Sequence, residues 1–171
     1  MAADMIKRPF VLAFCALALS GCATLTSYDA AGDVHAFLVS IRDGDRAAFE
    51  AHVDRAALKQ QLEARVTAGL LKRKDALAAL GAVLAGPLAD AAVDQLVQPS
   101  VFLAVAEAKG YAPSKPLPSR AALTGSLRAL DDGRVCVATR RDGPCLLDFE
   151  KEDGVWKLVA FEGDVSQLKL R

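Results

Sequence analysis

The sequence predicts an α+β fold, in which an N-terminal helical cluster packs on a C-terminal four-stranded antiparallel meander. Apolar residues recur at helical spacing over residues 33–110, and a proline-rich segment follows over 111–120. Beyond it, three Asp-Gly dipeptides interrupt alternating apolar and polar residues at intervals of about ten residues. We therefore expect helices, a linker and a sheet (121–165) in one domain, 33–171.

The helical half begins at GDVHAFLVSIRDGD, where apolar residues form one helical stripe from Val34 to Ile41. Asp33 is the expected N-cap of this helix, and Gly44 the residue that ends it. Asp45 and Asp54 are expected to cap the next two helices, the second of which repeats an apolar residue every four positions.

The most apolar stretch after the N-terminal segment is ALAALGAVLAGPLADAAVDQLV, which Gly86-Pro87 divides into two helices. The part before the division has about ten residues, whereas a bilayer span needs about 20. Buried helices are therefore expected, with a membrane-inserting hairpin as the alternative. Pro99 starts the last helix of this half, which ends at Gly110.

In the strand half, Asp-Gly between alternating runs is a strong hairpin signal. The expected strands lie near 123–130, 134–140, 145–151 and 155–162. Two-residue turns would pair Ala129 with Cys136, Leu127 with Ala138, Phe149 with Leu158, and Leu147 with Ala160. These side chains would share the face that packs on the helices. The opposite face mixes charges with valines, so it is either a partner or ligand surface or a face that meets the linker.

Residues 1–21 have the layout of a secretory signal peptide. Lys7 and Arg8 precede an apolar run over residues 10–19, and two small residues follow. The run is shorter than the roughly 20 residues that a membrane span needs. Met5 is an alternative translation start, because a charged opening follows it directly.

The sequence Leu19-Ser20-Gly21-Cys22 resembles the bacterial lipobox, whose cysteine receives a diacylglycerol and becomes the first residue after cleavage. The resemblance implies lipid attachment at Cys22, with acyl chains such as palmitate, and we expect a tether over residues 22–32. An ordinary signal peptide is the alternative. Two or more acyl chains anchor a protein stably. Ala23 stands where lipoproteins of the inner membrane often have Asp, which favours the periplasmic face of the outer membrane.

Charge and length narrow the class of protein. The chain has 21 basic and 21 acidic residues and no net charge, which gives no electrostatic reason to expect a nucleic-acid partner. Without residues 1–21, about 150 residues remain, enough for one domain.

Two of the four cysteines, Cys136 and Cys145, lie outside the N-terminal segment. An oxidising compartment favours a disulfide between them. A two-residue turn at Asp142-Gly143 would place Cys136 opposite Phe149 and separate the sulfurs too far for a bond. A four-residue loop would make the cysteines diagonal neighbours, which are closer together. The sequence therefore predicts neither the presence nor the absence of a disulfide between Cys136 and Cys145.

No convergent set of catalytic or metal-binding residues is visible. His35 and His52 are the only histidines, and no third histidine or cysteine stands at metal-ligand spacing. No phosphate-binding or nucleotide-binding motif occurs, so no cofactor is expected. Asp90 and Asp94 share one helix face, which is expected to be solvated. The basic run 72–74 is a solvated loop or a contact with anionic lipid headgroups.

The segments AFLVSIRDGDRAAFEAHVDRAALKQQL, LGAVLAGPLADAAVDQLVQPSVFLAVAEAKG and GVWKLVAF resemble a family of small secreted bacterial proteins known only as a domain of unknown function. Arg42, Asp43, Val53, Asp54 and Pro99 occupy its motif positions. These motifs are structural, so the resemblance implies no catalytic residue. The helices and meander also look like cone-shaped nuclear transport factor or cystatin-type folds, an analogy that transfers no function.

These observations predict a lipid-anchored envelope lipoprotein that is not an enzyme and that binds a partner protein or an envelope component. The excess of apolar residues over one sheet face favours an alternative, a carrier of an apolar ligand held between helices and sheet. A small enzyme of the cone-fold type, using His35 or His52 with a carboxylate, is the third hypothesis.

Overall fold

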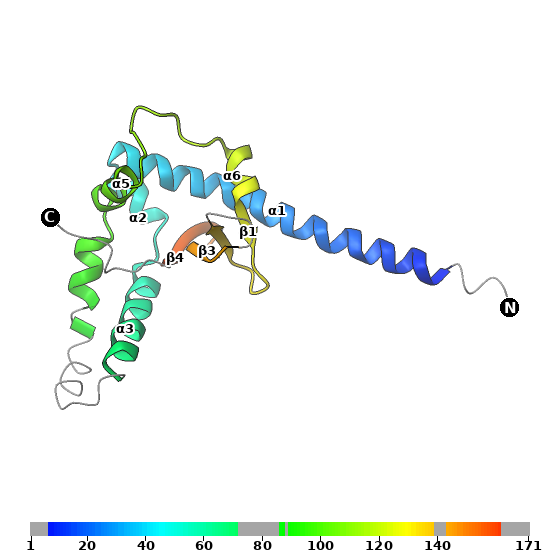
Figure 1. The fold of residues 1–171 in the computed structure, drawn as a ribbon, viewed down its shortest axis with the longest axis horizontal. Helices are drawn as coiled ribbons and strands as arrows, with labels where there is room; N and C mark the ends of the chain where they lie inside the picture. The colour runs from blue at the N-terminus through cyan, green and yellow to red at the C-terminus, as the bar shows by residue number, and fades with distance from the viewer. Residues whose placement is uncertain (1–6, 72–85, 88, 139–142, 162–171) are drawn as a thin grey trace.

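The computed structural model describes residues 7–71, 86–87, 89–138 and 143–161, with side chains from residue 24 onward apart from 69–71. Its helices are α1 (Lys7–Asp43), α2 (Arg46–Ala51), α3 (Arg55–Leu71), α5 (Pro99–Ala108) and α6 (Arg120–Ser126), and residues 86–87 and 89–96 are also helical. The strands are β1 (Leu127–Ala129), β2 (Val135–Ala138), β3 (Cys145–Glu152) and β4 (Val155–Phe161). The predicted α+β class is confirmed (Figure 1).

Helix α1 begins well before the helix start that was expected at Asp33. It does not begin at Asp33, and residues 22–32, expected as a tether, belong to one continuous helix. Ala30 and Ala31 are fully buried there, because they extend the apolar stripe of Val34 by another turn. The same helix continues toward the N-terminus and projects away from the body of the protein (Figure 1).

The predicted helix boundaries around α2, α3 and α5 are confirmed. The Asp45 carboxylate accepts a hydrogen bond from the backbone N–H of Ala48 at 3.0 Å, and Asp54 caps α3 in the same way. Gly44 ends α1 with a φ of +69°, a conformation that favours glycine. Pro99 is the first residue of α5, as expected.

The four strands form a meander in the order β1-β2-β3-β4, as predicted. The first strand is much shorter than expected, because residues 120–126 form α6 instead. The Ser119 side chain accepts from the backbone N–H of Ala122 at 3.3 Å and caps this helix. Ser119 followed by Arg-Ala-Ala-Leu is a helix-start signal, which the predicted strand over 123–130 did not take into account.

The predicted register between β1 and β2 is wrong by one residue. Leu127 pairs with Val137 and Ala129 with Val135, because the turn contains three residues, 131–133. Gly133 has a φ of +87° there, as three-residue hairpin loops require. A shift of one residue turns every side chain of a strand to the other face. Val135 therefore enters the core, and Cys136 lies on the opposite face.

The hairpin of β3 and β4 follows the prediction near its turn. Asp153-Gly154 forms the two-residue turn, and Phe149 pairs with Leu158 as expected. An irregularity between Asp148 and Phe149 then shifts the register. Leu147 therefore pairs with Phe161, not with Ala160.

The core lies between the helices and one face of the sheet. Four phenylalanine rings meet there, with centroid distances from Phe37 of 5.4 Å to Phe49 and 5.7 Å to both Phe102 and Phe149. They come from α1, α2, α5 and β3, so this cluster holds all the layers together. Leu158 on β4 is also fully buried.

The segment between α2 and α3 covers the free edge of β4. Val53 forms a parallel bridge with Leu158, whose backbone N–H donates to the His52 carbonyl at 2.9 Å. The Leu158 carbonyl in turn accepts from the N–H of Asp54 at 3.0 Å. The helical half is thereby hydrogen-bonded to the sheet.

Candidate functional site

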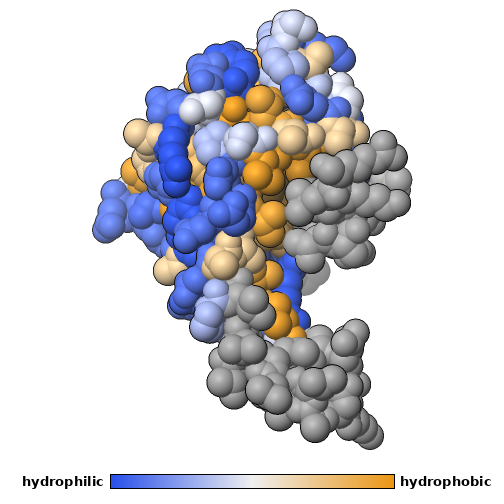
Figure 2. Space-filling view, turned by 90° about the vertical axis from the view of Figure 1, so that its left-hand side faces the viewer, coloured by the Kyte–Doolittle hydropathy of each residue, from blue (hydrophilic) through white to orange (hydrophobic). Residues whose placement is uncertain are grey.

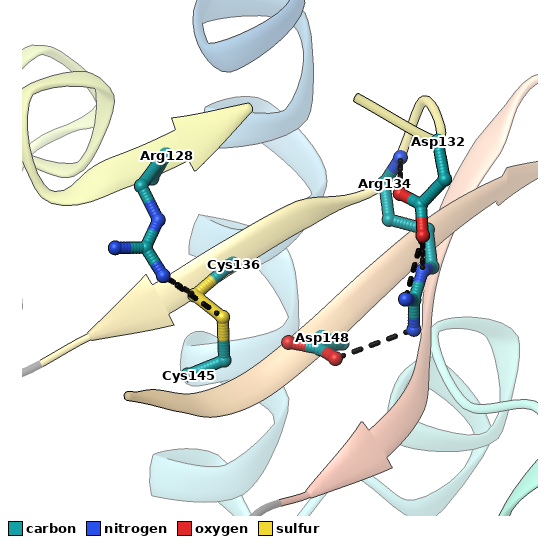
Figure 3. Close-up of a disulfide and its surroundings, with 6 residues drawn as sticks. All are labelled: Arg128, Asp132, Arg134, Cys136, Cys145 and Asp148. Carbon is teal, nitrogen blue, oxygen red and sulfur yellow. Dashed lines mark hydrogen bonds and ion pairs between the residues drawn. A yellow bond between two sulfur atoms is a disulfide. The ribbon is translucent and has the colours of Figure 1, made fainter. Parts of the chain in front are cut away.

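The outer face of the sheet carries a disulfide between Cys136 and Cys145 (Figure 3). Their Cα atoms are 5.4 Å apart. Neither loop length considered from the sequence describes the connection, because Ala138 pairs directly with Cys145 and Cys136 with Asp148. A register shift between Val137 and Ala138 makes the cysteines close neighbours on adjacent strands.

A guanidinium group lies beside both sulfurs. Nη2 of Arg128 is 3.5 Å from Sγ of Cys136 and 3.2 Å from Sγ of Cys145. Arg128 is placed there by the sheet, because it pairs with Cys136 across β1 and β2. Figure 3 shows it reaching over the disulfide from the neighbouring strand.

A buried carboxylate completes this face. The Asp148 side chain is only 12% exposed, and its Oδ2 accepts from Nη1 of Arg134 at 3.3 Å. Arg134 also forms an ion pair with Asp132 at 2.6 Å. The hydrogen bond that the Arg134 guanidinium donates to the Asp132 carboxylate lowers the pKa of Asp132 and raises the pKa of Arg134.

Three of these side chains are grouped closely enough to be considered as metal ligands. An Asp148 oxygen and the two sulfurs lie within 4.8 Å of one another. However, thiolates are the metal ligands, and both sulfurs are bonded to each other. Cys136 is also fully buried, so the arrangement is that of a structural crosslink between β2 and β3.

A second polar cluster joins α1 to the hairpin of β3 and β4. Oδ2 of Asp29 accepts from Nε1 of Trp156 at 2.8 Å and from Nζ of Lys151 at 2.7 Å. One turn later, Oδ2 of Asp33 accepts from the backbone N–H of Trp156 at 2.9 Å. The hydrogen bond from Lys151, then that from Trp156, lowers the pKa of Asp29. Asp33 therefore docks a strand and does not cap a helix.

The histidines occupy separate structural positions. His52 follows α2, and its Nδ1–H donates to the Ala48 carbonyl at 2.8 Å. Its Nε2 lies 4.0 Å from Oδ1 of Asp33, which is longer than a hydrogen bond. His35 lies half-buried within α1. The pairing of His52 with Asp33 thus lacks the geometry of a positioned general base.

The two carboxylates predicted on one solvated helix face are exposed but take part in ion pairs. Asp90 pairs with Lys59 at 2.7 Å, and Asp94 pairs with Arg55 at 3.5 Å. Arg55 also donates to the Glu50 carboxylate, which lowers the pKa of Glu50. These contacts hold residues 89–96 against α3, and we assign them a structural role.

A surface hollow of about 340 Å³ lies where α1 ends and α5 begins. It is away from the space between helices and sheet, where the carrier hypothesis requires a cavity. Its lining combines apolar side chains with two arginines, of which Arg42 is paired with Asp43 at 2.7 Å. The lining residues are Ile41, Arg42, Asp43, Gly44, Arg46, Pro99, Ser100 and Leu103.

Figure 2 shows the side of the molecule on which α3 and α5 lie, where apolar surface forms a band beside a hydrophilic area. Leu62 on α3 and Phe102 and Leu103 on α5 are partly buried against the core. The basic run 72–74 and the first part of the apolar stretch before Gly86 lie outside the described residues. Within the described part of the chain, no helix is both long and apolar enough to cross a membrane.

Comparison with known proteins identifies a family. The family described as "Protein of unknown function (DUF2939)" matches residues 12–105, more than half of the chain. The chain belongs to the DUF2939 family. The match runs from α1 into α5 and ends before the sheet, so the expected resemblance of the GVWKLVAF segment lies outside it. No curated protein and no solved structure gives a significant match.

Sequence reasoning identified the two cysteines but not the residues around them. Arg128, Asp148 and Arg134 come close to the cysteines only in the observed register of β2. The two-residue turn predicted at Asp132-Gly133 gave a different register. Asp131 ahead of Asp132-Gly133 was the available signal, since it permits a three-residue loop ending in glycine.

Proposed function

We propose that this member of the DUF2939 family is a lipid-anchored lipoprotein on the periplasmic face of the bacterial outer membrane, where its domain is a non-enzymatic interaction module. The observation that carries the proposal is Cys22 in Leu19-Ser20-Gly21-Cys22, directly behind a charged start and an apolar run. Several acyl chains on one residue give a stable anchor.

The course of α1 supports this proposal. Oγ of Ser27 donates to the Leu127 carbonyl at 3.4 Å, so contacts with the domain begin soon after Cys22. With a rise of about 1.5 Å per helical residue, the anchor lies only about 7–8 Å ahead of this contact. The anchor would therefore hold the domain close to the bilayer.

A protein or another envelope component is the partner that we favour, with the outer face of the sheet as the contact surface. The disulfide and the ion pairs of Arg134 lie on this face, and Leu146, which follows Cys145 on β3, is 37% exposed. A crosslinked surface loses little conformational freedom when a partner binds. Such pre-organisation supports an interaction surface.

The carrier alternative is less favoured because the four phenylalanine rings fill the centre of the region between helices and sheet. Native mass spectrometry of the secreted Cys22→Ala protein separates the alternatives. We expect an apo mass. A reproducible added mass that leaves on denaturation would favour the carrier.

The anchor is tested by the intact mass of the protein extracted from membranes. We expect loss of residues 1–21 and an added mass of diacylglycerol on Cys22. Cys22→Ala is the matched control and should carry no lipid. Membrane fractionation of the Ala23→Asp variant tests the sorting between inner and outer membrane, and we expect this variant to move to the inner membrane. An intact mass that shows an unmodified Cys22 in the wild-type protein would contradict the whole proposal.

A further inference from the structure

We propose that Leu25 and Tyr28 of α1 lie in the headgroup region of the bilayer and form a membrane-contacting face together with Arg120. This inference rests on the proposed lipid anchor at Cys22 and adds to it a defined orientation of the domain. The occupant of this face is a lipid surface, for which the following contacts argue.

Exposed apolar side chains are concentrated beside the anchor. Among the described residues, three large hydrophobic side chains are exposed: Leu25 (69%), Tyr28 (54%) and Leu146 (37%). The two most exposed follow Cys22 by three and six residues. Because they are three residues apart on a helix, they lie on the same side of α1. Exposed apolar groups that cluster in this way mark an interaction site.

A cation lies beside Tyr28. The guanidinium carbon of Arg120 lies 4.5 Å from the centroid of the Tyr28 ring, and Nη2 donates to the Tyr28 carbonyl at 3.2 Å. The absence of a side chain at Gly32 makes space for the Arg120 guanidinium, since a Cβ atom at this position would lie 3.3 Å from its carbon. Tyrosine and arginine combine an apolar body with a polar tip, and both suit the boundary between lipid and water.

The positions that adjoin this pair in the same turns contact the domain. Ser27, Ala30 and Ala31 are buried, and Asp29 holds Trp156 and Lys151. The helix therefore cannot rotate to bury Leu25 without losing these contacts. Because the lipidated residue belongs to the same helix, the bilayer is the surface nearest to the exposed side.

The test compares a tryptophan on α1 close to Cys22 with a tryptophan on α2, both in the lipidated protein. Leu25→Trp reports on the proposed membrane face, and Ala47→Trp on the exposed surface of α2, beyond the far end of α1, is the matched control. Both proteins are reconstituted in vesicles of phosphatidylcholine and phosphatidylglycerol brominated on their acyl chains. The signal of the buried Trp156 is subtracted with the parent protein.

We expect quenching of Leu25→Trp to exceed that of Ala47→Trp by several-fold. Equal quenching in a protein whose intact mass includes the lipid would overturn the membrane face and leave the anchor standing. A protein without lipid would overturn the anchor and, with it, this inference. Unfolding curves of both variants that match the parent protein exclude misfolding as the cause.

Discussion

Helix α1 contains two regions with opposite surroundings. Over residues 30–41, Ala30, Ala31 and Phe37 are fully buried, and the Phe37 ring packs against phenylalanine rings of α2, α5 and β3. Over residues 24–28, Leu25 and Tyr28 are the most exposed large apolar side chains of the described chain. One helix without a break thus serves as the centre of the core and as the exposed stretch next to Cys22. The first region accounts for stability, and the second for the proposed membrane contact.

The largest effect is expected in the core region. Phe37→Ala removes the ring that contacts Phe49, Phe102 and Phe149, and the resulting cavity should lower the free energy of unfolding by about 3–5 kcal/mol. Urea unfolding of the Cys22→Ala protein measures it. Leu25→Ala is the matched control and should change the same quantity by less than about 0.5 kcal/mol. Equal losses would remove the distinction between the two regions.

The disulfide lies on the sheet face away from this core and should contribute independently of it. Replacing both cysteines, Cys136→Ala with Cys145→Ala, releases a loop whose closure entropy corresponds to about 2.5 kcal/mol. Urea unfolding should show this loss with the core fluorescence of Trp156 unchanged at zero denaturant. Loss of that native fluorescence would mean that the crosslink also organises the inner face.

Asp29 lies at the boundary between the two regions and gives a pH-dependent effect. Its pKa is lowered in the folded protein, so its contribution is present above the unfolded pKa of about 3.9 and is lost as the pH falls through the folded pKa. Asp29→Asn should lower stability at neutral pH by up to about 1 kcal/mol, because the ion pair is exposed. Thermal unfolding should show this difference vanish in acid.

A double-mutant cycle of Asp29→Asn with Lys151→Met provides the control for this interaction. The two changes should be less than additive, since each removes the same ion pair at 2.7 Å. Full additivity, or a difference that persists in acid, would contradict the assigned role of Asp29.

The smallest effect is expected at Gly32. An added Cβ would displace the exposed Arg120 guanidinium, which can move, while alanine favours a helix by up to about 1 kcal/mol. Gly32→Ala should therefore raise the thermal midpoint slightly. A clear fall would show that the contact of Arg120 with Tyr28 helps to hold the leading part of α1 in place.

The sequence correctly predicted those features of the fold that short-range interactions determine. Caps such as Asp45 and Asp54, Pro99 at a helix start and the Asp153-Gly154 turn depend on a few neighbouring residues. The start of α1 was missed because a helix continues wherever nothing stops it, and residues 23–31 contain no glycine or proline.

The candidate site was harder to predict because it depends on register. One extra residue in the turn before Gly133 moved Val135 inward and brought Cys136 beside Arg128. The irregularity at Val137 and Ala138 then allowed the disulfide. Such shifts result from packing across the whole sheet, which no local pattern of this sequence records.

Neutron reflectometry of the lipidated protein on a supported bilayer tests the central claim most directly. If α1 is helical from Cys22 into the core, the domain should stand against the headgroups, because Cys22 lies only about 7–8 Å ahead of Ser27. An extended tether over residues 22–32 would instead span up to about 35 Å. A thin or absent water layer is the predicted result, and a hydrated gap approaching the tether length would contradict the account.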